Sequence, residues 1–140
     1  MHVAVVGLGA VGTRAARQLA STDAVERVTL YETLEGRVAE VSSSLGAKAH
    51  AGAGAPEVLA DVDVVLLATP CGSHLGLAGD LVARGIPVVS TSDDVDEVRS
   101  LLDLGPEAEA RFFSCSGDPR DLHSLPTRAL PISTDAVDRV

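Results

Sequence analysis

The fold of this chain is set by the stretch Val3-Ala4-Val5-Val6-Gly7-Leu8-Gly9-Ala10-Val11-Gly12. Its apolar start predicts a buried strand, and the glycines that follow predict a tight turn into a helix. Gly7, Gly9 and Gly12 have the G-x-G-x-x-G spacing of turns that hold a dinucleotide pyrophosphate. Gly7 allows the turn, Gly9 leaves the backbone open to phosphates, and Gly12 lets the helix pack on the sheet. The first N–H groups of that helix would then face the anion. A purely structural strand–helix turn is the alternative, because glycine-rich turns are common.

Composition places the chain in a broad class. Its 140 residues can form one domain with its own core, and the core must be aliphatic, since 46% of residues are hydrophobic but only three are aromatic. A net charge of −9 argues against sequence-independent nucleic-acid binding. The two cysteines give no disulfide framework, and neither a signal peptide nor a membrane-length apolar run is evident. We therefore expect a cytoplasmic protein without membrane or nucleic-acid partners.

Apolar runs alternate with helical periodicity along the chain. Strands are predicted at residues 3–6, 28–31, 47–50, 62–68, 87–90 and 111–115, and helices at 10–20, 34–45, 73–84 and 93–102. The buried faces of the first two helices are assigned to Val11, Ala15 and Leu19, and to Leu34, Val38, Val41 and Leu45. Ser73 and Ser92 are the expected N-caps of the last two helices. One further helical turn is expected at residues 57–60, and another at 107–110.

This alternation predicts an α/β fold, a Rossmann-type doubly wound parallel sheet in a three-layer αβα arrangement. The usual strand order places the first and fourth strands side by side at the switch point. Residues 7–12 and 68–71 should then line one crevice, because ligands of such sheets bind at the carboxyl ends of the strands. This convergence favours dinucleotide binding over the purely structural turn.

Glu32 follows the second strand, twenty residues after Gly12. An acidic side chain there can accept hydrogen bonds from the adenosine ribose hydroxyls, which favours NAD because a 2′-phosphate would meet a carboxylate. Arg37 is close enough in sequence to leave NADP open. The alternative for Glu32 is a solvated acid near a helix start.

The predicted cofactor contacts follow from this geometry. We expect the pyrophosphate at Gly7, Gly9, Ala10, Val11 and Gly12, the adenosine ribose at Glu32 and Thr33, and the nicotinamide at Ala68, Thr69, Pro70 and Cys71. His74 is included as a contact of the nicotinamide ribose or substrate, and its plainer interpretation is an exposed or capping histidine. Cys71 is interpreted as a small residue lining the cofactor rather than a nucleophile.

Other chemistries find little support in the sequence. Asp93, Asp94, Asp96 and Glu97 form an acidic cluster, but no ligand spacing supports a metal site. Residues 51–56 are interpreted as a flexible connector and not as a second phosphate loop. The lysine and the serine or threonine that a P-loop needs are absent. No nucleophile–base–acid set is evident, so the catalytic residues stay unassigned.

Several of these motifs together resemble a known group of enzymes. The stretch Leu66-Leu67-Ala68-Thr69-Pro70-Cys71-Gly72-Ser73-His74, together with residues 5–12, Glu32, 61–65 and 85–94, most resembles saccharopine-dehydrogenase-like NAD(P)-binding domains. The glucose–fructose oxidoreductase family is similar in its Ala-Thr-Pro…His pattern. It usually carries Glu-Lys-Pro after the fifth strand, where this chain has Ser92-Asp93-Asp94 and no lysine. Homoserine and aspartate dehydrogenase-type domains are also similar.

The resemblance covers residues 1–117, which we assign to an NAD(P)-binding Rossmann domain. Residues 118–140 are expected to be an irregular tail, because Pro119, Pro126 and Pro131 interrupt any helix or central strand. Ala129-Leu130-Pro131-Ile132 is the translation of the common sequencing-adaptor stretch GCTCTTCCGATC, so the tail resembles adaptor read-through. An ordinary proline-containing linker is the alternative. In enzymes of this kind a substrate domain follows, and we expect that domain to be missing here.

Two functions follow from this interpretation. The first is the cofactor domain of an NAD(P)-dependent oxidoreductase that acts on a small amino or hydroxy acid or a sugar-like substrate, inactive without its second domain. The second is a non-catalytic NAD(H)-binding sensor domain. A flavin or S-adenosyl ligand fits the three-glycine spacing less well, and assembly into a homo-oligomer stays open.

Overall fold

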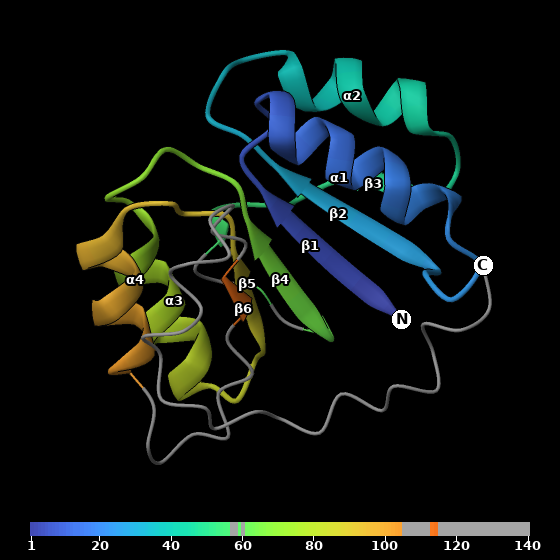
Figure 1. The fold of residues 1–140 in the computed structure, drawn as a ribbon. Coiled ribbons are helices and arrows are strands. Elements are labelled where there is room, and N and C mark those ends of the chain that lie inside the picture. Colours follow the sequence, from blue (N-terminus) through green and yellow to red (C-terminus); the bar gives the residue numbers. More distant parts are fainter. Residues whose placement is uncertain (57–58, 60, 105–112, 115–140) are drawn as a thin grey trace, which may run out of the picture.

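The structure is a computed structural model, and it describes residues 1–56, 59, 61–104 and 113–114. The strands are β1 (His2–Val6), β2 (Arg27–Tyr31), β3 (Ala49–Ala51), β4 (Val64–Leu67), β5 (Val88–Ser90) and β6 (Phe113–Ser114). The helices are α1 (Ala10–Ser21), α2 (Arg37–Leu45), α3 (His74–Ala83) and α4 (Val95–Leu102). Strands and helices alternate along the described chain, except that β4 follows β3 with no described helix between them (Figure 1).

The strands form a parallel sheet in the order β3-β2-β1-β4-β5-β6. This confirms the predicted doubly wound fold, in which the strand order reverses at β1. Val6, the last residue of β1, pairs in register with Tyr31 of β2 and Leu67 of β4. The three chain segments that leave these strands therefore start at the same edge of the sheet.

Alternation along β1 divides the core into two parts. Val3 and Val5 belong to a cluster that includes residues of α1 and α2, whereas Ala4 and Val6 belong to a cluster that includes residues of α3 and α4. Successive side chains of a strand point to opposite faces, so β1 is buried on both sides. This arrangement gives the predicted three layers.

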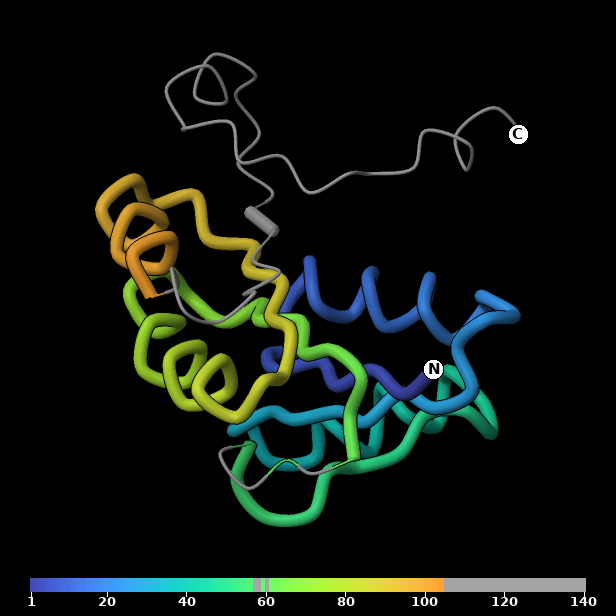
Figure 2. Tube along the Cα trace, turned by 90° about the horizontal axis from the view of Figure 1, so that it is seen from below, coloured from blue at the N-terminus to red at the C-terminus, as the bar shows by residue number. Residues whose placement is uncertain are grey.

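The helices are grouped as this core requires. Figure 1 and Figure 2 both show α3 and α4 side by side, at a distance from α1. The first turn of α1 and the start of α3 therefore belong to opposite layers. Within the described part of the chain, no helix is both long enough and apolar enough to cross a membrane.

Leu19 of the first predicted face and Val38, Val41 and Leu45 of the second pack in the core as predicted, but one residue of each face is wrong. Gly12 and Ala16 are the buried residues of α1, and Val11 is 57% exposed. A side chain larger than that of Gly12 or Ala16 would hold the helix away from β1, and this close approach turns Val11 toward the cavity described below. The second helix begins at Arg37 rather than residue 34, and Leu34 is 66% exposed in the preceding turn.

Several predictions fall partly or wholly on residues outside the described ranges. The third strand is shifted to Ala49–Ala51, and only Phe113–Ser114 of the predicted sixth strand is described. The predicted turns at residues 57–60 and 107–110 lie at least partly outside these ranges, and the tail from residue 118 lies wholly outside. Those predictions stand as made.

Candidate cofactor site

The glycine turn packs directly against the end of β4. Gly7 has a φ of +92°, and a β-carbon there would lie 2.6 Å from the backbone oxygen of Ala68. A β-carbon on Gly12 would overlap the carbonyl oxygen of Gly7. Both predicted roles are confirmed, since Gly7 makes the turn and Gly12 allows the helix to approach it.

Gly9 differs from its two neighbours in the motif. A β-carbon at this position would meet no other atom within 4 Å. Gly9 is also the N-cap residue of α1, and no side chain forms a capping hydrogen bond there. Across the described part of the chain, no side chain accepts a hydrogen bond from the first N–H groups of α1, and the space beside Gly9 is open. An anion is the ligand that such a helix end favours.

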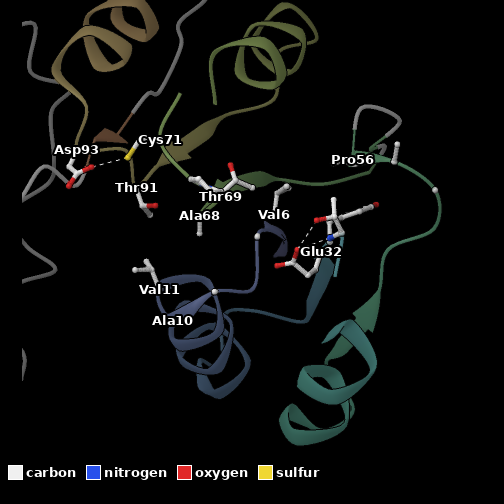
Figure 3. A pocket seen from close by; sticks show the side chains of 17 residues that line it. Val6, Ala10, Val11, Glu32, Pro56, Ala68, Thr69, Cys71, Thr91 and Asp93 are labelled. Carbon is white, nitrogen blue, oxygen red and sulfur yellow. Dashed lines mark hydrogen bonds between the residues drawn. The ribbon is translucent and has the colours of Figure 1, made fainter. Parts of the chain in front are cut away.

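A cavity of about 810 Å³ lies beside this turn (Figure 3). It is lined by Val6, Gly7, Gly9, Ala10, Val11, Tyr31, Glu32, Thr33, Gly54, Ala55, Pro56, Ala68, Thr69, Pro70, Cys71, Thr91 and Asp93. In the close view, Glu32 and Pro56 lie at one end, Cys71 and Asp93 lie at the other, and Val6, Ala10 and Ala68 lie between them. All predicted contacts except Gly12 and His74 line this cavity.

Sequence reasoning missed two loop segments of the lining. Gly54, Ala55 and Pro56 were interpreted only as a connector, yet they follow β3 and close the end of the cavity near Glu32. Thr91 and Asp93 follow β5 and line the opposite end. The available signal was topological, because every loop after a parallel strand leaves the sheet at the same edge.

Glu32 leaves the end of β2 and reaches back to the glycine turn. Its Oε2 accepts a hydrogen bond from the Leu8 N–H at 2.8 Å, and its Oε1 accepts from the N–H groups of Thr33 at 2.7 Å and Leu34 at 3.2 Å. The Leu8 hydrogen bond is the main cause that lowers the pKa of Glu32, with smaller effects from Leu34 and Thr33 against partial burial. Oε2 keeps acceptor capacity for a further donor from the cavity.

Arg37 does not line the cavity. Its Nε donates to the carbonyl oxygen of Leu8 at 3.2 Å, and its two terminal nitrogens donate to Glu40 at 2.8 Å and Thr13 at 3.3 Å. The guanidinium thus holds the glycine turn against the start of α2. All three of these partners lie outside the Glu32 side chain.

Cys71 and Asp93 form a pair at the end of the cavity remote from Glu32. The Cys71 thiol donates to Asp93 Oδ1 at 2.9 Å, and both side chains are exposed. This hydrogen bond is the largest cause that lowers the pKa of Asp93. The end of the cavity away from Glu32 therefore carries a carboxylate as well.

His74 is placed differently from the prediction. It is fully buried at the start of α3, not exposed, and it does not line the cavity. Its Nε2 lies 2.9 Å from the carbonyl oxygen of Thr69, and its Nδ1 lies 2.7 Å from Ser90 Oγ. Because a carbonyl oxygen can only accept, Nε2 carries a proton and donates it. His74 thus contacts the backbone of the cavity wall rather than the cavity.

One of the two predicted caps of the last two helices is confirmed in position, and the other is wrong. Ser73 is the N-cap residue of α3 as predicted, but it makes no capping hydrogen bond, and its hydroxyl donates to the carbonyl oxygen of Pro70. The N-cap of α4 is Asp94 rather than Ser92, and its carboxylate accepts from the Glu97 N–H at 2.8 Å. The N–H of His74 instead donates to Glu97 of α4, a tertiary contact that local sequence cannot reveal.

The acidic cluster is dispersed in the structure. Asp93 pairs with Cys71, Asp94 caps α4, Asp96 is exposed, and Glu97 is buried against the start of α3. Across the described ranges, no group of three or more His, Cys, Asp or Glu side chains could hold a metal ion.

Fold and cavity define a Rossmann-type domain with a cavity at the switch point of its sheet, where dinucleotides bind in such folds. Residues 1–113 match the GFO/IDH/MocA family, described as "Oxidoreductase family, NAD-binding Rossmann fold". The chain belongs to this family and carries its NAD-binding domain. No curated protein matches the chain in sequence.

Solved structures of dehydrogenases share the fold. UDP-N-acetylglucosamine 3-dehydrogenase from Acidithiobacillus ferrooxidans is 25% identical with a TM-score of 0.65, over 81% of this chain and 36% of that one. Myo-inositol 2-dehydrogenase from Lactobacillus plantarum is 19% identical with a TM-score of 0.68, over 81% and 35%. Scyllo-inositol dehydrogenase from Lactobacillus casei, solved with NAD(H) and scyllo-inositol, is 18% identical with a TM-score of 0.66, over 82% and 36%. The chain spans about a third of their length.

These comparisons change the order of the family resemblances. They support the relation to the glucose–fructose oxidoreductase family, and they do not support the saccharopine-dehydrogenase-like label. That label was preferred because Ser92-Asp93-Asp94 replaces the expected lysine segment. In the structure Ser92 and Asp94 hold the start of α4, so these residues are accounted for by local structure.

Proposed function

We propose that this chain is the cofactor-binding part of an NAD-dependent oxidoreductase. The observation that carries the proposal is the open α1 terminus at Gly9, which lies in one cavity with the Glu32 carboxylate. The first supplies free N–H groups for a diphosphate, and the second supplies an acceptor for ribose hydroxyls. When bound, NAD supplies a hydride acceptor at its nicotinamide ring.

The cavity suggests how the dinucleotide lies. The diphosphate is proposed at Gly7, Gly9, Ala10 and Val11, with Gly12 beneath them as the residue that brings α1 close. The adenosine ribose is proposed at Glu32 and Thr33, beside the Gly54–Pro56 segment. The nicotinamide then lies toward Ala68, Thr69, Pro70 and Cys71. His74 is proposed to support this last wall from behind, because its ring is buried under Thr69.

NAD is favoured over NADP on electrostatic grounds. A 2′-phosphate on the adenosine ribose would approach Glu32, whose pKa is lowered so that it stays ionised at neutral pH. Arg37 lies nearby in sequence, but its guanidinium is engaged by Glu40, Thr13 and the Leu8 carbonyl. Among the described residues that line the cavity, none carries a positive side chain to balance a phosphate at that end.

The substrate is proposed to be small and polyhydroxylated, of a sugar-like or cyclitol class. Support comes from the family and from the similar dehydrogenases, whose names give inositols and a nucleotide-linked amino sugar as substrates. A small amino or hydroxy acid was the other class expected from sequence, and no comparison favours it. Substrate contacts and catalytic groups are proposed to come from a further domain, since the chain covers only 35–36% of these structures. A sensor function is less well supported, because the matching family is one of oxidoreductases.

Cofactor titration tests the proposal. The folded chain is expected to bind NADH more tightly than NADPH, measured by enhancement of NADH fluorescence. Glu32→Gln keeps the size of the side chain but removes its charge, and it should weaken NADH binding about tenfold, roughly the worth of one hydrogen bond to a charged group. The same variant should also lose its preference for NADH over NADPH.

Glu35→Gln is the matched control, because Glu35 is exposed in the same turn and changes the net charge equally. Its affinities should stay within about twofold of the parent chain, as expected for an exposed surface charge. Absence of NADH binding by the folded parent chain at millimolar concentration would refute the proposed function.

A further inference from the structure

The side chain of Glu97 is buried away from the cavity and is not explained by cofactor binding alone. Only 7% of Glu97 is exposed, although it lies in the first turn of α4. Burying a carboxylate is costly unless hydrogen bonds satisfy it. The hydrogen-bond donors that surround the Glu97 carboxylate therefore indicate its role.

Every partner of the Glu97 carboxylate comes from a segment that leaves the carboxyl edge of the sheet. Its Oε1 accepts from the His74 N–H at 2.8 Å, and its Oε2 accepts from the Gly72 N–H at 2.9 Å and the Ser92 hydroxyl at 2.6 Å. Gly72 and His74 surround the start of α3, where the predicted cap Ser73 makes no capping bond. A residue of α4 thus supplies the acceptor that α3 lacks, and its negative charge suits the positive end of that helix.

The same contacts extend to the cavity wall through His74. The His74 ring donates to the carbonyl oxygen of Thr69, and Ser90 Oγ lies 2.7 Å from its other nitrogen. Ser90 Oγ also accepts from the Ser92 N–H at 3.1 Å. Ser90 and Ser92 are both buried, so water does not compete for these groups. The chain of contacts joins β5, α4 and the segment that follows β4.

Residues 69–71 line the cavity at the end proposed for the nicotinamide. The segment is anchored at both ends, by His74 at Thr69, its first residue, and by Glu97 at Gly72, which follows its last residue. Burial raises the pKa of Glu97, but the hydrogen bonds from Ser92, Gly72 and His74 outweigh this and lower it, so the charged form is the one that fits.

We propose that Glu97 is a positioning residue that fixes the 69–73 wall and so sets the affinity for the nicotinamide half of the dinucleotide. This inference rests on the proposed function, because it uses the placement of NAD along the cavity. Glu97 itself does not line the cavity. Its effect must therefore appear on the half of the ligand that meets this wall, and not on the half that meets Glu32.

Two probes separate the halves of the ligand. NADH carries the nicotinamide and ADP-ribose lacks it, and the binding of both is measured by isothermal titration calorimetry on the whole chain. Glu97→Gln retains one acceptor oxygen for three donors, so the wall loses part of its anchoring. We expect its affinity for NADH to fall about tenfold, a change typical of losing hydrogen bonds to a charged group, and its affinity for ADP-ribose to change less than about twofold.

Asp96→Asn is the matched control, because Asp96 is the preceding residue of α4 and its side chain is 93% exposed. It removes the same charge and a surface ion pair with Arg99, and it should leave both affinities unchanged. Equal losses for both probes in Glu97→Gln, or no loss for either, would overturn the positioning role. A parent chain that binds neither probe would refute the proposed function, and the inference with it.

A milder variant covers the case in which Glu97→Gln does not fold. Ser92→Ala removes only the hydroxyl that donates to Oε2. It should weaken NADH binding about threefold while leaving ADP-ribose binding unchanged, since one of the three hydrogen bonds is lost. If Ser92→Ala changes both affinities alike, the proposed role of Glu97 is wrong.

Discussion

The cavity has two walls that are held in different ways. The glycine wall, residues 7–11, is shaped by the absence of side chains, since Gly7 lies against Ala68 and Gly9 faces open space. The loop wall, residues 69–73, is shaped by side chains that come from elsewhere, namely His74 and Glu97. A wall of the first kind can be recognised in a short stretch of sequence, whereas a wall of the second kind depends on distant residues.

Each wall nevertheless has a carboxylate that accepts a hydrogen bond from its backbone. Glu32 accepts from the N–H of Leu8 in the glycine wall, and Glu97 accepts from the N–H of Gly72 in the loop wall. The difference is in burial, because Glu32 lies in the cavity lining and Glu97 does not. Glu32 is thus available to a ligand, while Glu97 is available only to the protein.

The largest effect on stability is expected at Gly12, where α1 packs against the glycine wall. Gly12→Ala places a β-carbon on the carbonyl oxygen of Gly7, and neither backbone segment can move without displacing β1 or α1. We expect a loss of about 3 kcal/mol or more in the free energy of unfolding, at the upper end of overpacking costs. Denaturant unfolding followed by circular dichroism measures it.

Gly9→Ala is the control for this effect, because its β-carbon meets no neighbour. Its stability should change by about 1 kcal/mol or less, as for an exposed helix N-cap. Binding of NADH should weaken all the same, since the new methyl group occupies the approach to the diphosphate. Similar destabilisation by the two substitutions would show that the glycines are not divided between packing and ligand approach.

A smaller effect is expected from acid, and the Glu97→Gln variant isolates the part of it that comes from the buried carboxylate of the loop wall. The pKa of Glu97 is lowered from its ordinary value of 4.5 in the folded chain, so the unfolded chain binds more protons as the pH falls below that value. The stabilisation is therefore fully present above about pH 4.5, and it is lost as the pH falls through the lower folded value.

Thermal unfolding of the parent chain and Glu97→Gln between pH 7 and pH 3 measures this loss. The variant should be less stable near neutral pH and lose less stability on acidification than the parent chain does. Glu35→Gln, at an exposed position, should follow the parent curve. Parallel curves for Glu97→Gln and the parent chain would contradict the role of the buried carboxylate.

The smallest effects compare a local cap with a tertiary one. Asp94→Ala removes the N-cap of α4 and should cost about 1 kcal/mol, a typical value for such a cap. Ser73→Ala, at the start of α3, should cost less than about 0.5 kcal/mol, since Glu97 accepts from the first turn of that helix. Chemical denaturation ranks the two, and a larger cost at Ser73 would show that the serine holds α3 after all.

Prediction from sequence was most successful where the relevant signal is local. The stretch from Val3 to Gly12 correctly predicted the strand, the turn, the helix and the packing role of Gly12. Prediction failed at His74, which was expected to contact the nicotinamide ribose or substrate, or else to be exposed or to cap the helix. It is buried instead, and its burial depends on Ser90 and on the position of α4. It also missed Gly54–Pro56 as cavity lining, since nothing in that segment differs from an ordinary connector.

The sequence by itself determined the alternating parallel fold and the glycine wall, because periodicity and missing side chains act over a few residues. It also placed Glu32 beside the glycine turn, since strand order is regular enough to bring the end of the second strand beside the first. Only the tertiary structure decided which acidic side chain caps α3 and which face of α1 is buried. Both depend on how closely elements from distant parts of the chain approach one another, and no short stretch of sequence specifies that distance.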